Sequence, residues 1–165
     1  MREEPPDSMS LFAKLSRVIA TNKTSESHET PLNEPEEPVD VEHEFEELMA
    51  QVDDVLQTDG VHFEDAMIKE NLDDILLMLI SLHGETHGKE LLSDLDSLFE
   101  TELSPGTVYP RLHDLEDEEI LSMHSKIRTK EYAIADDDHV RSSVEETMVQ
   151  HLAFGLLLYA FLYRL

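Results

Sequence analysis

Cysteine is absent from this sequence of 165 residues, and glycine occurs only 5 times. Without cysteine, disulfide bonds, thiolate metal sites and cysteine nucleophiles are excluded. The few glycines form neither a glycine-rich phosphate loop nor the Gly-x-Ser-x-Gly turn of serine hydrolases. Because those motifs carry the chemistry of large enzyme families, we expect a protein that is not an enzyme and that has no cofactor.

Long apolar runs are also missing. Met1 is followed by REEPPDSMS, which lacks the continuous apolar core of a secretory signal. The uncharged run from Leu152 to Tyr163 has 12 residues, whereas a helix that spans a bilayer needs about 20. We therefore expect a cytoplasmic protein and disfavour a membrane protein, although a membrane-associated C-terminal tail stays open as an alternative.

Positive charge is scarce. The sequence has 12 lysines and arginines against 38 acids, which gives a net charge of -26 and a pI of about 4.4. Such a protein either repels nucleic acid and binds basic partners, or carries the dispersed carboxylates of an organism that lives in high salt. The sparse lysine and the lack of cysteine favour the second interpretation and a halophilic archaeon as the source. In that case the net charge says little about the binding partner, and the local distribution of charge has to indicate which kind of partner the protein binds.

The first third of the chain holds segments outside the predicted core. Residues 1–23 include an amphipathic, locally basic helix at 9–20, which either docks on a protein surface, its own or a partner's, or binds a membrane. Residues 24–43 form an acidic linker interrupted by prolines. Residues 44–60 carry a second amphipathic helix, which Gly60 is expected to end. The apolar stripe of the first helix consists of Leu11, Phe12, Leu15, Val18 and Ile19.

The densest apolar pattern begins in the segment 61–136. A mostly buried helix is predicted over 71–83, with Asn71 or Asp73 as its N-terminal cap. A second, amphipathic helix follows Thr86, which has the side chain of an N-cap. The apolar face of this second helix is predicted to consist of Leu91, Leu92, Leu95, Leu98 and Phe99.

The third helix of this domain has a clear start, with Ser104 as its N-cap and Pro105 at the first helical position, where a missing N–H costs nothing. The periodicity then changes to two short strands at 121–125 and 130–135, followed by one long helix at 137–165. This order is that of a winged helix-turn-helix. We expect a mainly α fold with a small β-hairpin and a long C-terminal dimerisation helix. The inward face of the third helix is predicted to consist of Val108, Leu112 and Leu115.

Two stretches, HGKELL and LSPGTVYPRLHDLE, resemble the PadR family of winged-helix transcription regulators, over roughly residues 70–136. The resemblance implies a sequence-specific DNA-binding regulator that dimerises through C-terminal helices. The chain departs from the family pattern at Glu119, where the family has a glycine, and at Ala135, where it has a threonine. The matching residues are His87, Gly88, Glu90, Leu91, Leu103, Ser104, Gly106, Thr107, Val108, Tyr109, Pro110, Leu112, Leu115 and Glu116.

Basic residues gather in this region despite the net charge, since 4 of the 12 lysines and arginines lie between positions 111 and 130. Arg111 would reach a guanine edge or a phosphate. The lysine and arginine side chains of the wing would reach the DNA backbone or the minor groove. Tyr109 is either a phosphate contact or a half-buried packing residue. The alternative is a solvated hairpin with an ordinary turn composition. We expect contacts with double-stranded DNA from Ser104, Thr107, Tyr109, Arg111, His113, Lys126, Arg128 and Lys130.

The C-terminal helix is apolar on nearly all sides. A helix of this kind is normally buried, so we expect it to form the core of a homodimer. The alternative is a protein-interaction or membrane-associated module that shares the fold without binding DNA. The predicted dimer seam consists of Met148, Leu152, Gly155, Leu158, Tyr159 and Leu162.

Two histidines invite a metal assignment. His83 and His87 are four residues apart, as two ligands on one helix would be, but Gly84 interrupts that helix. The pattern also lacks the glutamate of a zinc-protease motif. We therefore expect no metal site.

Overall fold

In the computed structural model, the chain divides into two units, Met1–His62 and Phe63–Leu165. The predicted helix at 9–20, the whole segment 1–23 and the linker up to residue 39 lie outside the described residues. In the first unit, α2 spans Val41–Leu56, so it begins three residues before the predicted boundary at 44. The described residues are 40–56, 60–126, 128–162 and 164.

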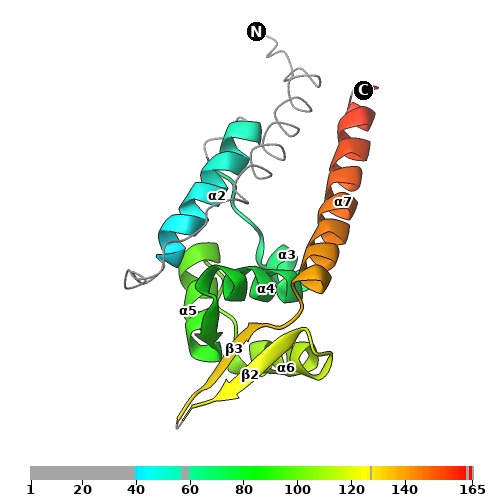
Figure 1. Ribbon diagram of the computed structural model, residues 1–165. Helices are drawn as coiled ribbons and strands as arrows, with labels where there is room; N and C mark the ends of the chain where they lie inside the picture. The colour runs from blue at the N-terminus through cyan, green and yellow to red at the C-terminus, as the bar shows by residue number, and fades with distance from the viewer. Residues whose placement is uncertain (1–39, 57–59, 127, 163, 165) are drawn as a thin grey trace, which may run out of the picture. The chain divides into compact units, whose positions relative to one another are not determined.

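The second unit has the predicted winged-helix order, preceded by one short helix (Figure 1). The helices predicted around 71–83 and after Ser104 are confirmed, and so is the hairpin, whose second strand ends one residue earlier than predicted. The elements are α3 (Asp65–Glu70), α4 (Leu72–His83), β1 (Glu85–His87), α5 (Gly88–Phe99), α6 (Pro105–Asp117), β2 (Leu121–Ser125), β3 (Lys130–Ile134) and α7 (Asp137–Leu162).

The core lies between α4, α5, α6 and the sheet. Apolar residues at helical spacing supply it, and the inward face predicted for α6 is confirmed. One end of α4 is joined to α5 by His83, whose Nε2 lies 2.8 Å from Asp94 Oδ2. Residues that are fully buried include Leu76, Leu79, Ile80, Leu91, Leu95, Val108, Leu112 and Tyr132.

The sheet has a third strand that the sequence pattern did not predict. It is antiparallel with the order β1-β3-β2, and Thr86 of β1 and Met123 of β2 both lie opposite Tyr132. The prediction of Thr86 as the N-cap of α5 is wrong, because Thr86 is buried in this strand and its Oγ1 donates to Glu90 Oε2 at 2.7 Å. The cap is His87, whose Nδ1 accepts from the Glu90 N–H at 3.0 Å.

The ends of α4 also differ in detail from the prediction. Asn71 occupies the N-cap position, but its side-chain amide donates back to the Met67 carbonyl at 2.8 Å and so belongs to α3. Gly84 ends the helix at φ +75°, a backbone conformation that glycine adopts without steric cost. The stop predicted at this glycine is therefore confirmed.

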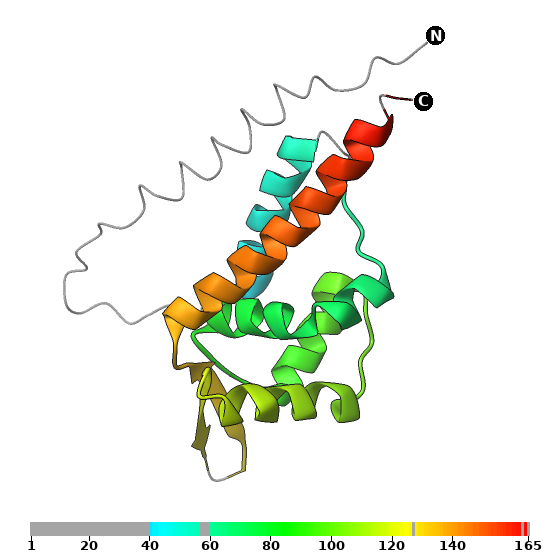
Figure 2. The same cartoon turned by 90° about the vertical axis from the view of Figure 1, so that its right-hand side faces the viewer.

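The long helix α7 leaves the winged helix on the side away from the hairpin (Figure 2). Along all 26 of its residues, none is buried in the single chain. Phe154 and Leu157 are 62% and 65% exposed. Among the described residues, no helix has both the length and the apolar character to cross a membrane.

Candidate nucleic-acid interface

The first turn of α6 presents two hydroxyl groups. Ser104 has the extended backbone of an N-cap, and Pro105 follows at the first helical position. The Ser104 Oγ lies 3.1 Å from Thr107 Oγ1, and both residues are exposed. A helix N-terminus with exposed hydroxyls and backbone N–H groups favours an anionic ligand. The predicted contacts of Ser104 and Thr107 with DNA are compatible with this geometry.

The outward face of α6 follows from its buried one. Because the inward residues repeat at three and four positions, the opposite side carries Gly106, Pro110, His113 and Asp117, all exposed. This is the face that a winged helix inserts into a major groove. His113 is the basic group on it, and its Nδ1 lies 3.4 Å from Glu116 Oε2 on the same helix.

Tyr109 joins α6 to the start of α5. Its side chain is half-buried, and its ring lies against Gly88, the first residue of α5. A Cβ atom on Gly88 would come within 2.6 Å of Tyr109 Cε1 and 2.8 Å of Cζ. The structure therefore gives Tyr109 a packing role, and the contact of its hydroxyl with phosphate stays a prediction.

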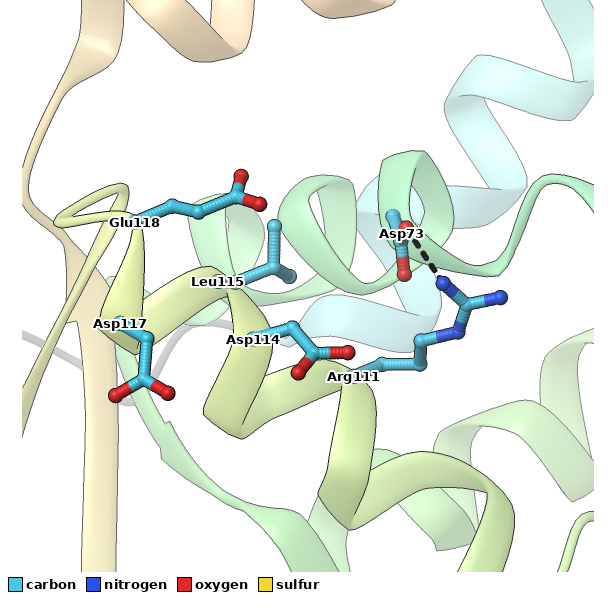
Figure 3. A pocket seen from close by; sticks show the side chains of 6 residues that line it. All are labelled: Asp73, Arg111, Asp114, Leu115, Asp117 and Glu118. Carbon is cyan, nitrogen blue, oxygen red and sulfur yellow. Dashed lines mark hydrogen bonds and ion pairs between the residues drawn. The ribbon is translucent and has the colours of Figure 1, made fainter.

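Arg111 lies on the flank of α6 that faces α4. Its Nη1 is 3.4 Å from Asp73 Oδ2, and both side chains are about half exposed. The two residues line a surface pocket together with Asp114, Leu115, Asp117 and Glu118 (Figure 3). An exposed ion pair of this kind contributes only about 0–1 kcal/mol. Arg111 can therefore exchange Asp73 for a phosphate or a base at little cost.

The Asp73 carboxyl is the perturbed acid of this pocket. Partial burial raises its pKa, and the negative charges of Asp74, Asp114 and Glu118 raise it further, while Arg111 opposes them. One of its oxygens, Oδ1, is buried and has no hydrogen-bond partner among the described residues. Arg111 thus partly neutralises an otherwise acidic pocket.

The hairpin tip carries the other basic side chains that are candidates for DNA contact. Lys126 Nζ pairs with the Glu131 carboxylate, and this hydrogen bond raises the pKa of Lys126 and lowers the pKa of Glu131. The Lys126 N–H donates to the Thr129 carbonyl at 2.8 Å and so closes the turn. Arg128 and Lys130 are exposed. The tip therefore offers two exposed cations and a third that an acid already holds.

Both candidate elements lie at one end of the second unit. Figure 2 shows α6 and the hairpin together at the bottom of the view, and α7 runs away from them toward the top. Sequence reasoning placed the cations on these elements but missed their acidic partners, Asp73 and Glu131. The Arg111–Asp73 pair joins residues 38 apart in the chain, so no local pattern predicts it.

Glu119 occupies the position where the PadR pattern has glycine. Its φ is +61°, in the left-handed region that a non-glycine residue adopts at a cost of about 1–2 kcal/mol. The Ile120 N–H donates to the Leu115 carbonyl at 3.0 Å just after it, so the chain still turns tightly out of α6. The exit from the helix therefore keeps a glycine-like backbone despite the substitution.

The predicted dimer seam runs along α7. Its residues are exposed apart from Tyr159, which is half-buried. At Gly155 a Cβ atom would meet nothing within 4 Å, so the side of the helix at this glycine is open. The described helix supplies the apolar surface for an interface that these residues were predicted to form.

Comparison with known proteins agrees with this geometry. A family model described as the transcriptional regulator PadR-like family matches residues 76–141. Transcriptional activator GvpE of Haloferax mediterranei is 36% identical over 140 residues, which cover 84% of this chain and 67% of that protein. The chain belongs to the PadR-like family of transcriptional regulators. The resemblance inferred from the motifs is therefore confirmed.

Two further similarities accompany this assignment. Transcriptional activator GvpE1 of Halobacterium salinarum is 39% identical over 116 residues, 70% of this chain, and this chain spans 61% of that protein's length. A solved transcriptional regulator from Clostridium thermocellum is 17% identical and aligns with a TM-score of 0.49, covering 56% of this chain and 95% of its own. The curated relatives come from halophilic archaea, in agreement with the source inferred from the charge.

Proposed function

We propose that this PadR-like chain regulates transcription by binding double-stranded DNA as a symmetric homodimer in the cytoplasm. It acts by binding alone, without catalysis. The observation that carries the proposal is the position of the exposed hairpin cations, Arg128 and Lys130, at the same end of the unit as the outward face of α6. In a chain with a net charge of -26, an exposed basic tip beside a recognition helix favours DNA as the ligand.

In the proposed complex, α6 enters the major groove and the hairpin tip follows the backbone. Ser104 and Thr107 contact phosphate at the start of the helix, and His113 faces the base pairs. Arg111 leaves Asp73 for a guanine edge or a phosphate. Asp117 ends the outward face of α6, about three and a half turns from Ser104, so the DNA contacts are made by the N-terminal part of that face, because carboxylates against phosphates lower affinity.

The homodimer provides two DNA-reading helices, one for each half-site of the DNA. A single winged helix contacts few base pairs, and specific regulators of this size bind two half-sites. Exposed apolar patches as large as that on α7 mark interfaces. We therefore assign the interface mainly to residues 144–162. The segment 9–20, which lies outside the described residues, is a further candidate for contact with a protein partner.

We further propose that the regulator activates transcription, since both curated relatives above are named transcriptional activators. Chromatin immunoprecipitation with sequencing tests the DNA-binding class, and transcript levels in a deletion strain test the direction. Discrete promoter peaks next to genes whose transcripts fall on deletion are expected. A lack of promoter peaks would instead favour the protein-interaction module, for which the exposed apolar surface of α7 is the supporting observation.

Selection on random duplexes tests the role of Arg111. The Arg111→Ala variant should relax the preference at one base position, by about 1–3 kcal/mol, if the side chain reads a base edge. If it holds phosphate, all sequences should weaken alike. Lys69→Ala on α3 removes the same charge away from α6 and serves as the control. Wild-type selectivity in Arg111→Ala would exclude Arg111 from the interface.

A further inference from the structure

Two neighbouring carboxylates in the first turn of α4 reach two different helices. Asp73 pairs with Arg111 of α6, as described above. Asp74 turns to α7, where its Oδ1 accepts from Ser143 Oγ at 3.0 Å and its Oδ2 accepts from Thr147 Oγ1 at 2.6 Å. We call Asp74, Ser143 and Thr147 the hydroxyl bracket. The start of α4 is thus the point at which the recognition helix and the long helix are tied together.

The hydroxyl bracket joins α7 to α4 through hydrogen bonds, which unlike apolar contacts depend on direction. Its two donors are four residues apart, so they lie on one face of the helix and together fix both its position and its rotation. The bonds are charge-assisted and part-buried, which strengthens them relative to exposed contacts. Because no residue of α7 is buried in the single chain, apolar packing does little to orient the helix.

A small change at this attachment is amplified by the length of α7. Residues 148–162 of the helix lie beyond the bracket, which is about 22 Å at a rise of 1.5 Å per residue. A rotation of about 5° at the bracket moves the far end by about 2 Å, which is more than half of one base-pair step. In a dimer joined through α7, the distance between the two α6 helices therefore depends on the bracket.

We propose that Asp74 is a positioning residue that sets the half-site spacing at which the dimer binds DNA. This inference rests on the proposed function, since it requires a dimer formed through α7. α6 is fixed to α4 by the apolar core, in which Leu76 and Leu112 are fully buried. Asp74 then fixes α4 to α7, so the bracket completes a rigid path from the DNA-reading helix to the dimer interface.

The test compares full-length wild type with a Ser143→Ala/Thr147→Val variant, which removes both donors with little change in volume. The probe is a duplex with two copies of a half-site that wild type selects from random sequences. Its spacer is lengthened one base pair at a time through one helical turn, about 10.5 base pairs. Ser142→Ala, an exposed neighbour on α7, is the matched control.

Wild type and Ser142→Ala should show one spacing optimum and lose about tenfold or more in affinity a few base pairs away from it. The double variant should bind best at a different spacing, or its affinity should fall by only about threefold or less a few base pairs away from the optimum. A threefold loss corresponds to less than about 0.7 kcal/mol of binding free energy. Its affinity for a single half-site, its dimerisation and its helical content should stay at the wild-type level. A merely structural role would change stability without moving the spacing optimum.

Asp74→Ala provides a second way to break the same bracket, and it should change the spacing profile in the same manner. A double variant with the wild-type optimum and sharpness would overturn the positioning role while leaving the proposed function intact. A wild-type protein that binds every spacing alike would overturn this inference alone, whereas one that binds no duplex would overturn the proposed function and this inference together.

Discussion

The contact between Gly88 and Tyr109 predicts that Gly88→Ala lowers the stability of the protein when Tyr109 is present and raises it when the tyrosine ring is removed. Gly88→Ala places a Cβ atom 2.6 Å from Tyr109 Cε1, 2.8 Å from Cζ and 3.0 Å from the hydroxyl oxygen. Ordinary carbon contacts lie at about 3.5–4.0 Å, so the ring has to move by roughly 1 Å or α5 has to shift from α6. Overpacking of this kind costs about 1–3 kcal/mol.

The same substitution also has a favourable component. Gly88 is the first residue of α5 and its φ is not in the left-handed region, so alanine fits its backbone. Replacing glycine by alanine at such a position gains about 0.4–1 kcal/mol, mainly from the unfolded chain. Gly88→Ala should therefore destabilise the wild type by about 0–2.5 kcal/mol. In a Tyr109→Ala background the clash disappears, and the same change should stabilise by about 0.5–1 kcal/mol.

A double-mutant cycle measures this coupling. Urea unfolding of the four proteins should be followed by circular dichroism in high salt, at one protein concentration because dimerisation affects apparent stability. The expected interaction free energy between the two sites is about 1–3 kcal/mol. Tyr109→Phe is the control, since Cε1 and Cζ remain and the clash should persist. Equal effects of Gly88→Ala in the wild-type and Tyr109→Ala backgrounds, meaning additivity, would refute the packing argument.

Three further predictions concern other parts of the chain. Glu119→Gly should raise the free energy of unfolding by about 1–2 kcal/mol, measured by urea denaturation, because glycine relieves the left-handed backbone. Truncation after residue 151 should abolish both the homodimer and specific DNA binding, as measured by light scattering and fluorescence anisotropy in high salt. Glutamine at three wing positions should reduce the slope of log K against log salt by up to about 2.7, if all three cations contact phosphate. The reduction should be about 1.8 if the ion pair with Glu131 keeps the Lys126 ammonium group away from the DNA. These wing positions are Lys126, Arg128 and Lys130.

Each of these predictions has its own control. Glu119→Ala removes the same charge without relieving the backbone, so equal stabilisation by alanine and glycine would point to charge as the cause. Glu131→Gln frees Lys126 and should steepen the salt dependence, and an unchanged slope in both wing variants would exclude the hairpin from DNA. A truncated chain that still dimerises would remove α7 from the interface. In that event another surface would have to join the two copies.

The sequence by itself determined the helices α4 to α7 and the hairpin of the DNA-binding unit. Ser104 occupies the N-cap position with an extended backbone, although its side chain caps no backbone N–H, and Pro105 starts α6 because its fixed φ and missing N–H suit the first helical position. The inward spacing of α6 and the alternation in the hairpin are likewise local, so they predict the core face and strands at 121–125 and 130–135, of which the second ends at residue 134 in the structure. The family pattern added the expectation of a DNA-binding regulator, which periodicity alone does not contain.

Only the tertiary structure decided which side chains meet. The strand β1 has three residues, too few for an alternating pattern, and it exists because β3 supplies its hydrogen-bond partners. That pairing buries Thr86 and leaves the capping of α5 to His87. The partners of Arg111 and Thr147 lie 38 and 73 residues away. Such contacts depend on how the helices cross once the core closes, and residue spacing along the chain does not encode that crossing.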